Sequence, residues 1–224
     1  MLFRSLGGNG LVVWAEQWVP SGLAALLVGT LPIWMVLVSW LWGGGRRPGV
    51  PLLLGLVWGL LGVGILGGAD GFGGGGRMGL VGGLAVISGC FAWAVGTILA
   101  KRAALPRALI LVSAMEMLCG GAWLLVVAAL TGELSRLGQV HPSGASLAAF
   151  AYLIVFGSLI GFSAYVWLNS VTSPALLSTY AYVNPVVALV LGWVVADEPL
   201  TLRTMVAALV ILSAVVVITR FDPA

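Results

Sequence analysis

The hydrophobic positions of this 224-residue chain fall in long, unbroken runs that glycines, prolines and charged residues separate. Runs of about 20 apolar residues have the length of a membrane-spanning helix. Their continuous hydrophobicity differs from the alternating pattern of an outer-membrane barrel, so the pattern predicts helices throughout. The sequence indicates an all-α polytopic membrane protein with eight transmembrane helices, at 2–18, 21–42, 50–68, 78–100, 107–131, 146–169, 174–196 and 202–219.

These spans repeat with an offset of 153 residues. Pro32 falls on Pro185 and Trp14 falls on Trp167 without a gap, so spans one to three correspond to spans six to eight. The period is five helices, an odd number, and the second copy therefore enters the membrane in the opposite direction. That arrangement is the inverted-topology repeat of secondary transporters.

The repeat predicts that the eight helices belong to a ten-helix inverted-repeat (5+5) transporter bundle. We expect 1–68 to hold the last three helices of the first repeat, 69–77 to be a Gly-rich linker, and 78–220 to be the second five-helix repeat. The partners of spans four and five would precede residue 1, so we expect an N-terminally truncated chain.

Charged residues make up only 8% of the chain, against about 25% in a soluble domain. They stand singly or in pairs, which does not suit a nucleic-acid-binding surface. Cys90 and Cys119 lie in apolar runs and are interpreted as small buried hydrophobes, and no second His or Cys stands near His141. We therefore expect no cofactor, no metal site and no catalytic residue.

The basic residues predict the orientation in the membrane, because they gather on the cytoplasmic side. With both termini inside, seven lie on the inner side and three on the outer side. The inner residues are Arg4, Arg46, Arg47, Lys101, Arg102, Arg107 and Arg220, and the outer ones are Arg77, Arg136 and Arg203. This bias predicts a multi-pass protein of the cell (inner) membrane with cytoplasmic N- and C-termini.

The two repeat-related prolines indicate where a substrate would bind. A proline in mid-helix removes a hydrogen bond and leaves backbone polar groups that lipid cannot satisfy. A kink absorbed by a neighbouring helix would explain either proline alone, whereas a symmetric pair favours a polar cavity near the midplane. The substrate-cavity candidates are Trp14, Thr30, Pro32, Trp34, Glu116, Trp167, Tyr180, Tyr182, Asn184 and Pro185.

Two acidic residues are candidates for ion coupling. Glu116 lies about ten residues into the fifth span, near the midplane, where a carboxylate costs a few kcal/mol and should face the bundle interior. It is interpreted either as a proton- or cation-coupling site or as a structural acid bonded to neighbouring helices. Glu16 lies at the end of the first span, where a charge reaches the headgroups, so a structural or gating role competes with substrate contact.

Three stretches resemble a known family: GGNGLVVWAEQWVPSGLAALLVGTLPIWMVL (7–37), SAMEML (113–118) and SPALLSTYAYVNPVVALVLGWVVADEPLTL (173–202). They are similar to the EamA-type members of the drug/metabolite transporter superfamily. The resemblance implies ten helices as two inverted five-helix repeats, and export of amino acids, metabolites or drugs. By the family's pattern, this chain begins at the third helix.

We therefore expect a secondary transporter that exports small metabolites, amino acids or drugs by alternating access. The alternatives are a non-transporting or inactive truncated membrane protein and, less favoured, an intramembrane enzyme, for which no paired nucleophile and base are found. The expected partners are a small-molecule substrate and the lipid bilayer, with protons as candidate coupling ions, a homodimer as a candidate assembly, and no nucleic acid.

Overall fold

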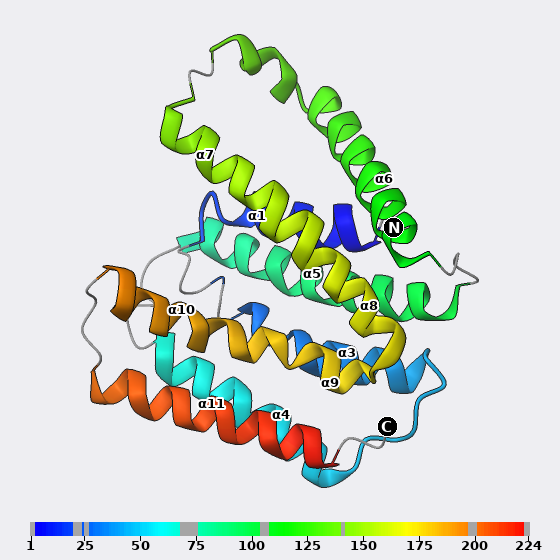
Figure 1. Cartoon of the computed structure of the whole chain (residues 1–224), viewed down its shortest axis with the longest axis vertical. Coiled ribbons are helices and arrows are strands. Elements are labelled where there is room, and N and C mark those ends of the chain that lie inside the picture. Colours follow the sequence, from blue (N-terminus) through cyan, green and yellow to red (C-terminus); the bar gives the residue numbers. More distant parts are fainter. Residues whose placement is uncertain are drawn as a thin grey trace.

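The chain folds into packed helices in a computed structural model that describes residues 3–19, 24, 27–67, 76–103, 108–139, 142–196 and 201–221 (Figure 1). No strand occurs among these residues, which confirms the all-α prediction. In chain order the elements are the π-helix η1 (Phe3–Gly10), α1 (Leu11–Ala15), α3 (Leu31–Leu41), α4 (Val50–Gly67), α5 (Gly76–Arg102), α6 (Leu109–Leu130), the 3-10 helix η3 (Glu133–Gln139), α7 (Gly144–Tyr152), the π-helix η4 (Leu153–Phe162), α8 (Ser163–Val171), α9 (Pro174–Ser178), α10 (Tyr180–Ala196) and α11 (Leu202–Phe221).

Four helical segments of the described chain are long and apolar enough to cross a membrane. They are Leu80–Arg102, Ile110–Leu130, Gly144–Val171 and Leu202–Phe221, and each coincides with a predicted span. The apolar helices Leu31–Leu41 and Val50–Ile65 are shorter. The prediction of eight spans in an inverted repeat therefore stays a prediction. Of the expected linker at 69–77, residues 69–75 lie outside the described residues, and 76–77 already belong to α5.

Both proline-containing spans are interrupted, but not in the same way. In the second span, Gly29 and Thr30 form a turn and α3 begins at Leu31, so Pro32 lies in the first helical turn, where its missing N–H has no intrahelical partner to lose. The prediction of a mid-helix proline was therefore wrong for Pro32. In the seventh span, α9 ends before a turn at Thr179, and Pro185 lies inside α10.

Threonine hydroxyls close both interruptions. Thr30 Oγ1 donates to the Leu27 carbonyl at 2.6 Å, and Thr179 Oγ1 donates to the Leu176 carbonyl at 2.7 Å. Each of these carbonyls also accepts the backbone N–H of the same threonine, at 3.0 and 3.2 Å, so the hydroxyl adds a second hydrogen bond at the turn.

Helices α4 and α11 pack along most of their lengths at the lower edge of Figure 1. Shifted by the 153-residue offset, α4 falls on α11, so the two helices are equivalent in the predicted repeat. Their shared core contains the buried residues Leu52, Leu56, Val63, Ile211 and Ile218. A second core lies where α3, α5 and the α9–α10 segment meet, and it contains Met35, Val86, Ala94, Leu177 and Ala181 among its buried residues.

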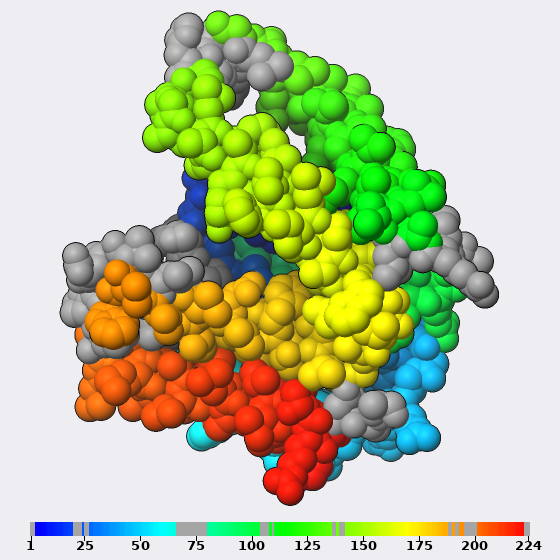
Figure 2. Space-filling model, in the orientation of Figure 1, coloured from blue at the N-terminus to red at the C-terminus, as the bar shows by residue number. Residues whose placement is uncertain are grey.

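The opposite edge of the molecule is formed by α6 and the continuous α7–η4–α8 segment, joined through η3 (Figure 1). Figure 2 shows an opening between these two arms toward their η3 end. Within Gly144–Val171, the most apolar stretch has none of its residues buried. Apolar side chains on such a surface are compatible with contact to lipid, which costs them nothing.

The close contact of α4 with α11 depends on glycine, and this yields a test. A Cβ at Gly62 would lie 2.7 Å from Ile211 Cγ1 and 3.0 Å from the Ile211 backbone nitrogen. We expect Gly62→Ala to push the helices apart and to lower stability by about 1–3 kcal/mol, the usual cost of overpacking. The measurement is thermal unfolding of the purified protein in detergent.

Gly121→Ala is the matched control, since it makes the same change within α6, where a Cβ would meet nothing within 4 Å. It should leave the melting temperature unchanged or slightly raised. Equal effects of the two substitutions would contradict a tight α4–α11 contact.

Candidate functional site

A buried ion pair joins the start of the chain to α6. Arg4 Nη2 of η1 donates to Glu116 Oε2 of α6 across a separation of 112 residues. The two residues are 3% and 4% exposed, and they are the buried charged residues of the described chain. Glu116 therefore lies in the interior, as expected of an intramembrane carboxylate. Arg4, which was assigned to the inner membrane surface, is instead its partner; that assignment was wrong.

Small residues bring η1 close enough to make this pair. A Cβ at Gly96 of α5 would lie 3.0 Å from both the Arg4 backbone nitrogen and Cβ, and a Cβ at Gly120 of α6 would lie 2.3 Å from Ser5 Oγ. Since both glycines are needed for the contact, η1 is wedged between α5 and α6 at backbone distance. This position of η1 places the Arg4 side chain between α5 and α6, beside Glu116, which lies one helical turn before Gly120.

Aromatic rings surround the Arg4 guanidinium. Its Cζ lies 4.7 Å from the ring centroid of Phe162, 5.2 Å from that of Tyr165 and 5.7 Å from that of Trp93. Ring faces at these distances stabilise a cation that has been removed from water. The positive charge is thus held by one carboxylate and three rings, which come from α5, η4 and α8.

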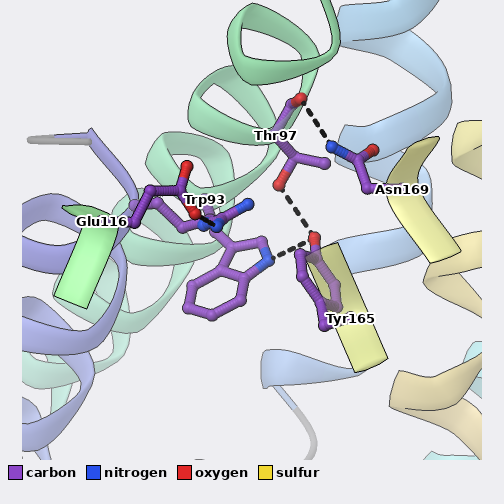
Figure 3. A network of polar contacts seen from close by, with 6 residues as sticks. Trp93, Thr97, Glu116, Tyr165 and Asn169 are labelled. Atoms are coloured by element: carbon purple, nitrogen blue, oxygen red, sulfur yellow. Dashed lines mark hydrogen bonds and ion pairs between the residues drawn. The ribbon is translucent and has the colours of Figure 1, made fainter. Parts of the chain in front are cut away.

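A hydrogen-bond network extends from these rings (Figure 3). Trp93 and Thr97 are four residues apart on α5, and Tyr165 and Asn169 are four apart on α8, so each pair lies on one face of its helix. Trp93 Nε1 donates to Tyr165 Oη at 2.9 Å, and Thr97 Oγ1 is 2.8 Å from the same oxygen. Asn169 Nδ2 donates to the Thr97 carbonyl at 3.4 Å.

One polar atom of this network is left over. Asn169 is 6% exposed, and its Oδ1 has no hydrogen-bond partner among the described residues. A buried acceptor without a partner costs about 1–3 kcal/mol, which makes it a natural contact for a ligand N–H or O–H. We define the ion-pair site as Arg4, Trp93, Thr97, Glu116, Phe162, Tyr165 and Asn169.

Two of the predicted cavity aromatics, Tyr180 and Trp34, pack against the same core as Trp93 and Tyr165 of the ion-pair site. The Tyr180 ring meets the Tyr165 ring at 5.7 Å, nearly perpendicular to it. Trp34 packs edge-on against Phe91 at 5.4 Å, in the same core as Tyr180. Both are partly buried. With Trp93, Phe162 and Tyr165 they form a group of aromatic side chains, here called the aromatic wall, that includes residues of α3 and α10.

The other predicted site residues are spread over the molecule. Tyr182 is fully buried and its hydroxyl donates to the Leu56 carbonyl at 2.8 Å, which ties α10 to α4. Asn184 is exposed although it lies one turn from Tyr180, and Pro185 and Thr30 are half-buried. The exposed residues Trp14, Glu16 and Trp167 lie at the surface, where Trp14 meets Trp18 at 4.6 Å, whereas Pro32 is buried at the start of α3.

The residues that reasoning from the sequence missed are Arg4, Trp93, Thr97, Phe162, Tyr165 and Asn169 as a group. The signal for four of them was the i, i+4 spacing of aromatic and polar residues inside apolar spans. Arg4 could have been found by asking which cation neutralises Glu116, since a lone carboxylate is costly in lipid. In the described residues, no three His, Cys, Asp or Glu side chains group closely enough to hold a metal ion.

Both π-helices belong to the surroundings of this site. η1 carries Arg4 and η4 ends at Phe162, and shifting η4 by the 153-residue offset places its end one residue before the end of η1. π-helical turns are rare and frequently occur at functional sites. The same departure from α-helical geometry thus occurs at positions that the predicted repeat makes equivalent.

Comparisons with known proteins identify the relatives of the chain. The sequence model of the EamA-like transporter family matches residues 80–220. The chain is 37% identical over 213 residues to the uncharacterized inner membrane transporter YedA of Escherichia coli (strain K12), which covers 95% of this chain and 66% of that protein. It is 27% identical over 206 residues to the uncharacterized transporter YvbV of Bacillus subtilis (strain 168), covering 92% and 65%.

The chain thus spans about two thirds of the length of these curated relatives. A solved crystal structure superposes on it with a TM-score of 0.74 at 22% sequence identity, covering 97% of this chain and 75% of the other. That likeness supports the helical arrangement described above.

The ion pair predicts a specific pattern of stability. Glu116→Gln leaves the Arg4 cation buried without a counter-charge, which should cost about 3–5 kcal/mol, and Arg4→Gln should do the same to the carboxylate. The double variant Arg4→Gln, Glu116→Gln should regain most of this loss, because neither charge then remains. Unfolding in detergent of the four proteins measures the coupling free energy.

Glu16→Gln is the control, since it neutralises an exposed acid and should change the melting temperature little. Purely additive losses in the double variant would contradict a direct Arg4–Glu116 interaction.

Proposed function

The chain belongs to the EamA-like transporter family, and from this premise we propose that it acts in a secondary transporter that exports small metabolites, amino acids or drugs across the inner membrane by alternating access. The named relatives are transporters, which is not an enzyme class, and the apolar helices make the chain a membrane protein. Its substrate, its mechanism and the full bundle of two inverted five-helix repeats are parts of the proposal.

The observation that carries the proposal is the Arg4–Glu116 pair. Arg4 belongs to the proposed first-repeat segment 1–68 and Glu116 to the proposed second repeat 78–220, so the pair connects the two units that alternating access moves against each other. An ion pair in a low-dielectric interior is strong when formed and costly when broken. The arrangement of the repeats in which the pair is formed and the one in which it is broken would therefore differ in free energy.

Coupling follows from the chemistry of the pair. A proton that reaches Glu116 would neutralise the carboxylate and release the Arg4 guanidinium, which would then bind an acidic group of the substrate. Loss of that proton would restore the pair and expel the substrate. Glu116 is thus the proposed coupling residue, whereas Glu16, exposed at the end of the first helical segment, is assigned a structural or gating role.

The aromatic residues limit the kind of substrate. Trp93, Phe162, Tyr165 and Tyr180 offer ring surfaces beside one cation and one unpartnered amide oxygen. That combination suits a small amphipathic molecule with an apolar body, an acidic group for Arg4, and an N–H or O–H for Asn169.

The orientation with both termini inside is also part of the proposal. Arg4 is buried and no longer counts toward the inner surface, but six basic residues against three still favour the same orientation. A non-transporting membrane protein is the alternative, and it would keep the ion pair for stability alone. A homodimer stays a prediction.

Transport by reconstituted protein separates these functions. Proteoliposomes holding a labelled amino-acid mixture, or an amphipathic dye, should release label faster when a pH gradient is imposed. The double variant Arg4→Gln, Glu116→Gln should fold but lose the dependence on the gradient, because no titrating carboxylate remains. A folded wild-type chain that moves none of the probes supports the non-transporting alternative. If the double variant keeps the wild-type dependence on the pH gradient, Glu116 is not the coupling residue.

A second variant tests the aromatic wall. Tyr165→Phe keeps the ring and removes the oxygen that joins Trp93 to Thr97, so the apparent KM should rise about fivefold, equivalent to about 1 kcal/mol. Tyr152→Phe makes the same change on the exposed surface of α7 and should leave KM unchanged. Equal KM values for the two variants would remove Tyr165 from the substrate site.

A further inference from the structure

A pocket of about 410 Å³ lies where a loop, a helix end and a turn meet, and none of its described lining residues belongs to the ion-pair site. It is bounded by the α3–α4 loop, the C-terminal end of α5 and the α8–α9 turn, which come together at the right-hand side of Figure 1. The lining residues that matter for its chemistry are Ser39, Arg46, Lys101, Val36, Leu52 and Ala175. A volume of this size holds a small organic ligand or a lipid headgroup.

Two cations from different elements face this pocket. Arg46 is exposed on the α3–α4 loop, and Lys101 lies in the last turn of α5, where its Nζ donates to the Thr172 carbonyl. That hydrogen bond fixes the ammonium beside the α8–α9 turn. None of the described lining residues is acidic, so the charges that they contribute make the potential of the pocket positive.

Hydroxyl groups complete the polar part of the lining, but not all of them are available as donors. Ser170 Oγ donates to the Trp167 carbonyl at 2.6 Å and Thr172 Oγ1 to the Leu168 carbonyl at 2.8 Å, so their protons are used within their own helix. Ser39 makes no side-chain hydrogen bond among the described residues and is half-buried. Ser173 Oγ accepts from the Leu176 N–H at 3.1 Å and caps α9. Arg46, Lys101 and Ser39 are therefore taken as the donors to a ligand.

The floor of the pocket is apolar. Val36, Leu52 and Ala175 are 6%, 2% and 5% exposed and belong to the core between α3, α4 and α9. A ligand that fills the pocket thus places an anionic group among the cations and an apolar part against these side chains. Three donors from separate elements match the several acceptor oxygens of a tetrahedral anion better than a single carboxylate.

We propose that this pocket is a binding site for the phosphate group of an amphipathic molecule at the membrane surface, with an anionic phospholipid headgroup as the expected source. Three other basic residues lie outside the lining: Arg47 in the same α3–α4 loop, Arg102 in the last turn of α5, and Arg220 in the last turn of α11. They favour an anionic leaflet at this end of the molecule. The inference does not depend on transport.

The test is binding of defined probes to the purified protein in detergent, followed by native mass spectrometry. The probes are dioctanoyl phosphatidylglycerol, dioctanoyl phosphatidylcholine and inorganic phosphate. The variant Arg46→Gln, Lys101→Gln should weaken phosphatidylglycerol binding at least tenfold. The matched control Arg47→Gln, Arg220→Gln removes the same charge outside the lining and should weaken it less than threefold.

Two more variants guard against misfolding. Arg46→Lys, Lys101→Arg keeps both charges and should retain binding within about threefold, and Ser39→Ala should weaken binding by a few-fold with an unchanged melting temperature. Competition by inorganic phosphate at the same site, with weaker binding of phosphatidylglycerol, would identify a soluble phosphate compound as the source of the group.

Three results would overturn the proposal. The first is equal loss of phosphatidylglycerol binding in the pocket variant and in the control, which would indicate attraction by surface charge alone. The second is equal binding of phosphatidylcholine and phosphatidylglycerol, which would exclude selection of an anionic phosphate. The third is binding of neither phosphatidylglycerol nor inorganic phosphate by the wild-type protein.

Discussion

A charge inside an apolar protein needs a partner, and this constraint organises the structure around Arg4 and Glu116. Each residue would be costly alone in a helix bundle surrounded by lipid, and together they form an ion pair that is nearly inaccessible to solvent. The pair requires η1 to lie at backbone distance from both α5 and α6, which explains the small residues at Gly96 and Gly120. The rings of Trp93, Phe162 and Tyr165 then close around the guanidinium.

Glycine also allows a close backbone approach where α4 packs against α11. Gly62 allows α4 to approach the backbone of α11, and the Tyr182 hydroxyl ties α10 to the Leu56 carbonyl of α4. Dispersion and close packing hold such helices together in lipid, because apolar burial there gains little. Close contacts surround η1 and join α4 to α11, whereas the most apolar stretch of Gly144–Val171 has none of its residues buried.

The sequence predicted correctly those features that depend on hydrophobicity along the chain. The apolar runs located most helices, and the depth of Glu116 in its span predicted an interior carboxylate correctly. It was less informative where geometry decides. Arg4 stands near the start of a span and was placed at the membrane surface, since neither the π-helix nor its wedge between α5 and α6 is visible in a hydrophobic pattern. Pro32 was expected in mid-helix because it lies in the middle of the apolar run 21–42, whose hydrophobic pattern does not show the turn at Gly29 and Thr30. The surface positions of Trp14 and Trp167 were likewise decided by which face of each helix packs.

The central claim is that Glu116 is an ionised carboxylate paired with Arg4, and the vibrational spectrum of that side chain tests it most directly. Infrared difference spectra of wild-type protein and the Glu116→Gln variant, recorded at neutral pH in lipid, isolate the bands of this one group. The account predicts a carboxylate band that shifts when Arg4 is replaced by Gln. A protonated carboxyl band at neutral pH, or a carboxylate band indifferent to Arg4, would contradict it.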